Sequence, residues 1–306
     1  MYTEISKNKR NSILLMLVFM MVVIALGWVF SQALGEPAIV YGATAFALIY
    51  TWISYYNSDK MALAASHARR VEKKDAPELY RLVENLAITA GLPTPKIYII
   101  DDTAPNAFAT GRDPEHAVIC VTTGILQKLD KAELEGVIAH ELSHVGNYDI
   151  RFMSLVVVLV AIIALMSDWF LRFTFWGGGD NDRDRGNGQL QMILMAAGII
   201  LAILAPIIGT LMQLALSRKR EYLADASGAL LTRHPAGLAS ALRKISDDAE
   251  PLEAANKATA NLYIVNPFRA NVKVGRDARR WFANLYSTHP PIDERIKRLE
   301  EMNTHA

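Results

Sequence analysis

Cysteine and net charge are the two things that this sequence has least of. Its 306 residues include one cysteine, Cys120, so no disulfide can form within the chain, which fits a reducing compartment. The 32 lysines and arginines are offset by 31 aspartates and glutamates, which leaves a formal net charge of +1. A chain without a basic excess lacks the attraction on which nucleic-acid binding depends, so we expect no nucleic-acid partner.

Long apolar runs are abundant instead. Hydrophobic residues make up 52% of the chain, and the excess is gathered in four blocks, at 13–34, 38–55, 152–171 and 190–216. A hydrocarbon core of ~30 Å is crossed by a helix of about 20 residues. We therefore predict four transmembrane helices and a lipid bilayer as the surroundings of the chain.

Two alternatives to this membrane interpretation stay open at this point. Block 13–34 follows Lys7, Lys9 and Arg10 and ends near Ser31-Gln32-Ala33, a pattern shared with cleaved signal peptides. The run is longer than a usual signal sequence and a second apolar block follows at once, so we favour a retained helix. Blocks 152–171 and 190–216 could instead form a buried helical hairpin of a large soluble core.

The positions of lysine and arginine predict the orientation. Basic residues precede the first block, follow the second and follow the fourth, and such residues are retained on the cytoplasmic side. We expect a multi-pass protein of the inner or plasma membrane with both termini in the cytoplasm. The expected units are two transmembrane helices (1–56), a cytosolic part (57–151), a transmembrane hairpin (152–216) with an external loop at 172–189, and a second cytosolic part (217–306).

The soluble parts predict a mainly helical α+β fold with a small sheet. Residues 57–94 have helical periodicity. Short β-rich segments at 96–100, 106–110 and 117–122 are separated by turn residues. Asp130 and Glu133 have the spacing of a capping box and predict the start of another helix.

Acidic residues in the external loop resemble half of a calcium site. Asp180, Asp182 and Asp184 alternate as calcium ligands do, but the glycine comes one place late and Gln191 stands where a bidentate glutamate is needed. We therefore interpret this segment as a flexible loop outside the membrane.

The run His140-Glu141-Leu142-Ser143-His144 carries the chemistry. In a helix, positions i and i+4 lie on one face, so both imidazoles can reach one metal ion. Glu141 then lies beside the open position of the metal, where it can take a proton from a bound water. The pattern predicts a zinc-dependent protease with one ion per chain.

A catalytic zinc site needs a third protein ligand. Ile150 stands where a metzincin would have its third histidine, which excludes that class. The other histidines are His67, His116, His234, His289 and His305, and the downstream carboxylates include Glu221, Asp225, Glu250, Glu253 and Glu294. Glu221 is favoured because it lies four residues from Asp225 on one helix face, so that one can bind the metal while the other supports a histidine ligand. Otherwise Glu221 would pair with Arg218 or Lys219 on a solvated face.

Four motifs together resemble the HtpX-type membrane zinc metalloproteases, gluzincins related to the CAAX prenyl proteases. These motifs are His140-Glu141-Leu142-Ser143-His144, Asn106-Ala107-Phe108-Ala109-Thr110-Gly111, Glu221-Tyr222-Leu223-Ala224-Asp225 and Thr288-His289-Pro290-Pro291. The resemblance implies a zincin-like domain in which His140, His144 and Glu221 bind zinc, Glu141 is the general base and Asp225 supports a histidine. It further implies that Asn106, Ala107, Phe108, Ala109 and Thr110 line the cleft as an edge strand and that His289 is a candidate oxyanion donor.

Placement near the membrane suggests the kind of substrate. We expect the active-site helix to continue into block 152–171, with Arg151, Arg218, Lys219 and Arg220 at the headgroup level. Substrates would be unfolded or membrane proteins, and the resemblance implies quality control of damaged membrane proteins under stress. The alternatives are a narrow-specificity processing protease of the CAAX type and a non-catalytic zinc scaffold, whose fourth ligand could be Cys120. The sequence leaves the oligomeric state open.

Overall fold

The structure is a computed structural model that describes residues 2–159, 162, 218–255, 259–267 and 290–304. Most of the two later apolar blocks, the external loop and His289 lie outside the described residues. The expected third and fourth transmembrane helices therefore stay predictions, apart from helical residues 152–159 and 162 at the start of block 152–171.

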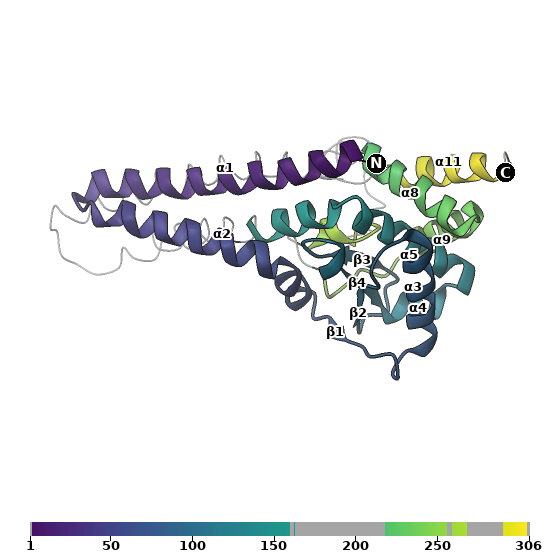
Figure 1. Cartoon of the computed structure of the whole chain (residues 1–306). Helices are drawn as coiled ribbons and strands as arrows, with labels where there is room; N and C mark the ends of the chain where they lie inside the picture. Colours follow the sequence, from purple (N-terminus) through teal and green to yellow (C-terminus); the bar gives the residue numbers. More distant parts are fainter. Residues whose placement is uncertain (1, 160–161, 163–217, 256–258, 268–289, 305–306) are drawn as a thin grey trace, which may run out of the picture.

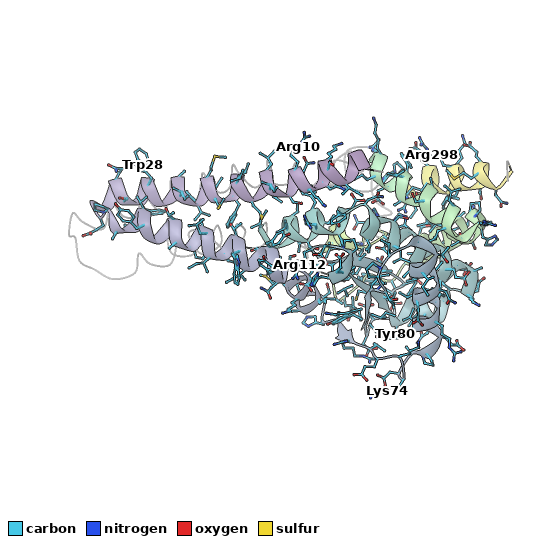
Figure 2. All side chains as sticks on the ribbon, viewed as in Figure 1. Arg10, Trp28, Lys74, Tyr80, Arg112 and Arg298 are labelled. Atoms are coloured by element: carbon cyan, nitrogen blue, oxygen red, sulfur yellow. The ribbon has the colours of Figure 1, made fainter. Side chains whose placement is uncertain are left out.

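Two long helices form a rod that projects from the rest of the molecule. Helices α1 (Tyr2–Leu34) and α2 (Ala38–Ala65) run side by side, and their far ends lie well away from the sheet (Figure 1). Among the described helices these two are long and apolar enough to cross a membrane. Their apolar windows are only 24% and 11% buried, whereas a core helix of a soluble protein would be mostly buried. We call the remainder of the described molecule, which contains the sheet and the helices packed around it, the body. In Figure 2, Trp28 lies near the outer end of the rod and Arg10 nearer the body.

The predicted small sheet is confirmed. It contains β1 (Arg69–Arg70), β2 (Lys96–Ile100), β3 (Ala107–Thr110) and β4 (Val118–Thr122) in the order β1-β2-β4-β3. Strands β2 and β4 are parallel and the other pairs are antiparallel, and β3 is an edge strand because it comes last in the order. Gly111 ends β3 with φ of 142°, and a Cβ there would come within 2.5 Å of the His116 carbonyl oxygen, so only glycine fits.

The predicted continuous helix at 57–94 is wrong. Helix α2 ends at Ala65, residues 66–76 form a connection that includes β1, and α3 (Pro77–Ala90) begins anew. His67 has a positive φ of 52°, which interrupts a helix, and Pro77 takes the first helical position where its missing N–H costs nothing. Periodicity alone did not reveal this break.

Helix α5 (Lys131–Gly146) carries the two histidines, and it starts at the predicted capping box. The short helices η1 (Pro114–His116) and α4 (Thr123–Lys128) come between β3 and α5. The expected continuation of α5 into the third apolar block is wrong, because Tyr148 has a φ of 61° and the chain turns there. A separate helix covers residues 149–159. It begins at Asp149, whose side chain therefore does not continue the face of α5.

The second half of the chain packs on α5. Helices α8 (Arg218–Thr232) and α9 (Pro235–Asp247) contact it, α11 (Ile292–Thr304) packs on α9 and α8, and the short η2 (Ala260–Leu262) lies near β3 (Figure 1). Gly136 permits the contact with α9, since a Cβ there would lie 2.7 Å from the Leu238 backbone nitrogen. The core around α5 includes Val137, Ile138 and Leu142.

Glu133 generates a testable prediction about stability. Burial raises its pKa, but hydrogen bonds from Lys244, Ser240 and the Asp130 N–H outweigh burial and lower it. Glu133→Gln keeps the size of the side chain and removes the charge, so we expect thermal unfolding roughly 2–4 °C earlier at pH 7.

The pH dependence of this effect follows from its sign. Because the pKa of Glu133 is lower in the folded than in the unfolded chain, its stabilisation is present above about pH 4.3 and is lost as the pH falls through the folded value. The difference in melting temperature between wild type and Glu133→Gln should therefore shrink on acidification. Glu135→Gln, on the same helix with an exposed partner, Lys131, is the matched control. A difference that grew on acidification would contradict the assignment.

Candidate active site

His140, His144 and Glu221 converge in the interior of the body. Their ligand atoms all lie within 4.8 Å of one another, and all three residues are buried. The two Nε2 atoms are 3.2 Å apart, and His144 Nε2 is 3.5 Å from Glu221 Oε1. The histidines come from successive turns of α5, and the glutamate comes from the first turn of α8.

Two of the three separations match those around a tetrahedral zinc ion. Two ligand atoms about 2.05 Å from a common ion, at a tetrahedral angle, lie roughly 3.3 Å apart. The observed separations of 3.2 and 3.5 Å bracket this value. Two imidazoles and one carboxylate are also the donor set expected of catalytic zinc, with one position left for water.

Each histidine has a carboxylate behind it. His140 Nδ1 is 2.9 Å from Asp225 Oδ1, and His144 Nδ1 is 3.0 Å from Asp149 Oδ2. Both outer nitrogens therefore point at acceptors while both Nε2 atoms point at the common centre, which is how histidine ligands are usually oriented. Sequence reasoning named Asp225 but missed Asp149, because the turn at Tyr148 that brings it back toward His144 has no signal in the apolar pattern.

Glu141 is buried beside the two histidines. Burial raises the pKa of its carboxyl to about 7, and the nearby Glu221 adds to the shift, while His144 and the Ala109 N–H oppose it. The hydrogen bond from Ala109 links the middle of β3 to this carboxylate. A carboxyl with a pKa near neutrality can both accept and return a proton.

Arg295 lies at the back of the cluster, and sequence reasoning missed it. It comes from α11, is 1% exposed, and donates from Nε and Nη2 to the two oxygens of Asp225 at 2.8 and 2.7 Å. Its Nη1 is 3.4 Å from Glu221 Oε2. Burial raises the pKa of Asp225, but Arg295 and His140 more than offset this and hold it at about 2. In the sequence, Arg295 looks like any arginine of a charged surface helix.

Arg220 corrects an expectation. Arg218 and Lys219 are exposed as expected of residues at a membrane surface, but Arg220 is buried. Its Nη1 donates to Asn8 Oδ1 at 2.7 Å and to Asp149 Oδ1 at 3.3 Å. A buried guanidinium requires such partners. Arg220 therefore pairs with Asp149 in the interior and does not extend to the lipid headgroups.

The close approach of α8 to α5 brings the two halves of the cluster together. Gly228 lies one turn beyond Asp225, and a Cβ there would be 3.0 Å from the backbone nitrogen of His140. A larger residue at this crossing would have to push α8 away from α5. The glycine thus fixes the reach of Glu221 and Asp225 to the histidines.

Among the residues that the structure describes, the cluster contains more negative than positive charge. Four buried carboxylates, of Glu141, Asp149, Glu221 and Asp225, face two buried guanidinium groups, of Arg220 and Arg295. With neutral imidazoles this leaves a formal excess of two negative charges, which a divalent cation would neutralise. Protons can do the same: burial lowers the pKa of His144, but Asp149 and Glu221 raise it overall to about 9.

The predicted substrate strand borders this cluster. Residues Asn106 to Thr110 are all buried, and β3 forms the edge of the sheet. The Thr122 N–H donates to the Asn106 carbonyl, so alternate residues Ala107 and Ala109 turn their backbone groups away from β4. Part of this outer edge is already paired, since the Ile264 N–H donates to the Ala107 carbonyl at 2.9 Å.

Cys120 lies apart from the ligand cluster. It is buried in β4 and packs in an apolar cluster with Phe108 and Tyr263. Burial raises the pKa of its thiol, so the thiolate form that binds zinc is disfavoured. The described residues therefore supply no cysteine as a fourth ligand.

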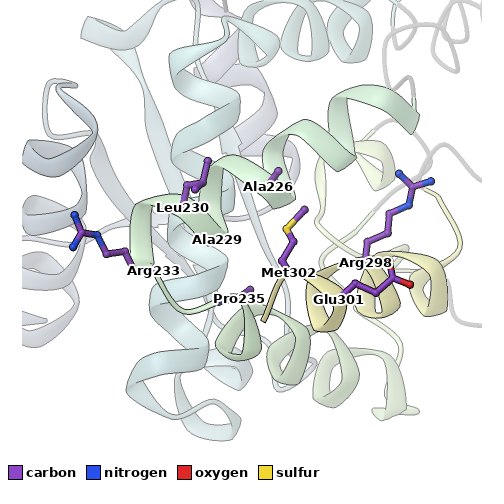
Figure 3. Close-up of a pocket in the computed structure, with 8 residues that line it drawn as sticks. All are labelled: Ala226, Ala229, Leu230, Arg233, Pro235, Arg298, Glu301 and Met302. Atoms are coloured by element: carbon purple, nitrogen blue, oxygen red, sulfur yellow. The ribbon is translucent and has the colours of Figure 1, made fainter. Parts of the chain in front are cut away.

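An open pocket of about 920 Å³ lies elsewhere, between α8, α9 and α11 (Figure 3). Ala226 and Leu230 line it from α8, Arg233 from the turn after α8, and Arg298 and Met302 from α11. Ala226 and Leu230 occupy a different face of α8 from Glu221 and Asp225. The pocket includes none of the predicted site residues.

Comparison with known proteins places this site in a family. The model of Peptidase family M48 matches residues 73–303. The chain is 46% identical over 302 residues to a Protease HtpX homolog of Tropheryma whipplei (strain Twist), which covers 99% of this chain and 98% of the relative. It is 44% identical over 309 residues to a Protease HtpX homolog of Lactobacillus helveticus (strain DPC 4571), covering 99% and 100%.

A solved structure shares the fold. The crystal structure of S. mikatae Ste24p superimposes with a TM-score of 0.52 at 16% identity, covering 98% of this chain and 67% of that one. The family match spans well over half of the chain, and the relatives match it along its whole length with the apolar helices included. The chain therefore belongs to peptidase family M48, as a membrane metalloprotease of the HtpX type.

Proposed function

We propose that this protein is an integral-membrane zinc endopeptidase that cleaves misfolded or damaged membrane proteins on the cytosolic side. The observation that carries the proposal is the convergence of His140, His144 and Glu221 next to a buried Glu141. A structural zinc site has all four positions filled by protein ligands and has no use for a general base beside the metal, which argues against the non-catalytic scaffold.

The chemistry divides between the metal and the protein. When bound by His140, His144 and Glu221, zinc supplies a Lewis acid that polarises the scissile carbonyl and acidifies a water. Glu141 accepts the proton of the attacking water and returns it to the nitrogen of the leaving amine. The hydroxyl of the water stays on the new carboxyl terminus and its proton goes to the new amino terminus. Asp225 and Asp149 hold the imidazoles by their Nδ1 atoms, so that both Nε2 atoms face inward.

The proposed substrate is an extended peptide that adds to the outer edge of β3. Ala109 lies nearest to Glu141 along this edge, as its hydrogen bond to that carboxylate shows. A peptide held there by backbone hydrogen bonds is read for shape more than for sequence, which supports broad specificity. Since the Ala107 carbonyl already accepts a bond from Ile264, the peptide must displace residues 263–265 or bind beyond them.

The membrane limits which chains can reach the site. The body lies at one end of the rod formed by α1 and α2 (Figure 1), so the site lies near the membrane surface, on the side that the basic flanks assign to the cytoplasm. Cytosolic loops and tails of membrane proteins are therefore the favoured substrates. A narrow processing protease is the second candidate, and a preference for a single substrate class would favour it.

The proposed ligand set predicts how variants bind zinc. Loss of a carboxylate that only hydrogen-bonds a metal ligand typically costs 10–100-fold in metal affinity. Glu221 is proposed to bind the metal directly, so Glu221→Ala should weaken zinc binding more than about 100-fold. Glu141→Gln, an equally buried neighbour outside the ligand set, should stay within a few-fold of wild type. Competition with a chromophoric chelator measures both. Equal affinity in Glu221→Ala and wild type would remove Glu221 from the ligand set.

The proposed base predicts a loss of activity without loss of metal. Glu141→Gln should lower the rate of cleavage of an unfolded membrane protein by about 100- to 10,000-fold. The assay compares zinc-loaded wild type and variant in detergent and in bilayers, with a soluble unfolded protein as a second substrate. Equal cleavage of soluble and membrane substrates in bilayers would argue against the proposed preference.

His289 lies outside the described residues, and its role as an oxyanion donor stays a prediction. His289→Ala should lower the rate of cleavage by ~100- to 1,000-fold with little change in zinc affinity. His305→Ala, near the end of the chain, is the control. Near wild-type rates in His289→Ala would exclude it as the donor.

A further inference from the structure

The N-terminal membrane helix contributes one buried amide to the body. Asn8 on α1 is 0% exposed, while its neighbours Lys9 and Arg10 are exposed. An amide in such a position requires partners for two donors and one acceptor. Its partners are all found in the part of the chain around the metal ligands.

Each hydrogen-bonding position of this amide is used. Asn8 Nδ2 donates to the Asn147 carbonyl at 2.9 Å and to Asp149 Oδ1 at 2.6 Å. Asn8 Oδ1 accepts from Arg220 Nη1 at 2.7 Å. The amide therefore binds both sides of the turn between α5 and the helix over 149–159, together with the first turn of α8.

Asp149 connects this amide to a predicted zinc ligand. Its Oδ1 faces Asn8 and Arg220, and its Oδ2 accepts from His144 Nδ1 at 3.0 Å. A carboxylate that is held at one oxygen can present the other in a fixed direction. Only two hydrogen bonds separate the α1 backbone from the imidazole of His144.

We propose that Asn8 is a positioning residue that couples the docking of the N-terminal membrane helix to the zinc centre. By fixing Asp149, Asn8 orients the His144 imidazole and favours its inward-facing nitrogen as a ligand. The zinc site is then fully formed only when α1 is seated against the body. This inference rests on the proposed function of His144 as a zinc ligand.

The location of Asn8 makes this coupling specific. The residue lies near the N-terminal end of α1, within the first turn of the candidate membrane span Ile5–Gln32, so a shift of α1 along its axis moves the amide away from Asp149. Arg220 alone would then face Asp149, at the longer distance of 3.3 Å. The carboxylate would regain freedom to rotate away from His144.

Variants of the full chain test the donor role of the amide. Asn8→Ala removes both the donor and the acceptor of the amide. Asn8→Asp keeps the shape of the side chain and the acceptor for Arg220 but cannot donate to Asp149. Both should weaken zinc binding by ~10-fold, near the lower end of the effect of outer partners. Ser12→Ala is the matched control, because Ser12 is buried one turn further on α1 and donates only to the Asn8 carbonyl.

Two readouts separate positioning from general destabilisation. The visible spectrum of the cobalt(II)-loaded chain should change in Asn8→Ala and Asn8→Asp but not in Ser12→Ala. The loss of zinc affinity in the double variant Asn8→Ala with Asp149→Asn should be less than the sum of the single losses, as expected if Asn8 acts through Asp149.

A measurement on the wild type needs no variant to fold. Coupling between two sites is reciprocal, so zinc should in turn dock α1. Hydrogen exchange of the backbone in residues 5–12 should slow when zinc is added to the full chain in nanodiscs.

The outcomes distinguish this inference from the function on which it rests. If wild type binds no zinc, or His144→Ala binds it equally well, the proposed site itself fails. If His144→Ala loses zinc while both Asn8 variants keep wild-type affinity and cobalt spectra, the coupling is overturned and the proposed function stands. Unchanged exchange at residues 5–12 on zinc addition would overturn it in the same way.

Discussion

The electrostatic balance of one buried cluster determines how the described elements meet. In the described part of this cluster, four carboxylates and two guanidinium groups lie in the interior, where an unpaired charge costs several kcal/mol. They come from α5, α8, α11 and the helix over 149–159, and α1 adds its amide. No single helix satisfies its own charges, so each must be in place for the others to be tolerated.

The excess of negative charge explains two properties of the site together. It favours a divalent cation at the meeting point of His140, His144 and Glu221, and it raises the pKa of His144 when protons must provide the positive charge instead. Proton binding and metal binding therefore compete for the same imidazole, and the affinity for zinc falls as the pH falls. Burial of Glu141 produces a base of nearly neutral pKa in the same place.

Local patterns in the sequence predicted most of the helices and strands. The features that these patterns did not predict depend on contacts between residues that are far apart in the sequence. The spacing of His140 and His144 determines their common face, the capping box marks the start of α5, and the turn residues separate the strands. The reversal at Tyr148 depends on one residue with a positive φ, which apolar periodicity does not register.

Charged residues were the hardest to place. Arg220 and Arg295 belong to charged segments that have the composition of solvent-exposed helices, and Asn8 precedes an apolar run as many polar residues do. Their burial follows from partners more than 60 residues away, at Asp225 for Arg295 and at Asp149 for Arg220 and Asn8. A single sequence contains no record of such pairings.

The distance in sequence between His144 and Glu221 has a consequence for synthesis. The helix with both histidines leaves the ribosome well before Glu221, and the third and fourth apolar blocks lie between them. A nascent chain therefore has the proposed general base and two of the proposed ligands but lacks the proposed third ligand, Arg220 and Arg295. We therefore expect the protease to stay inactive during its own translation, and to become able to cut neighbouring chains only after the later segments have been made and packed against the earlier ones.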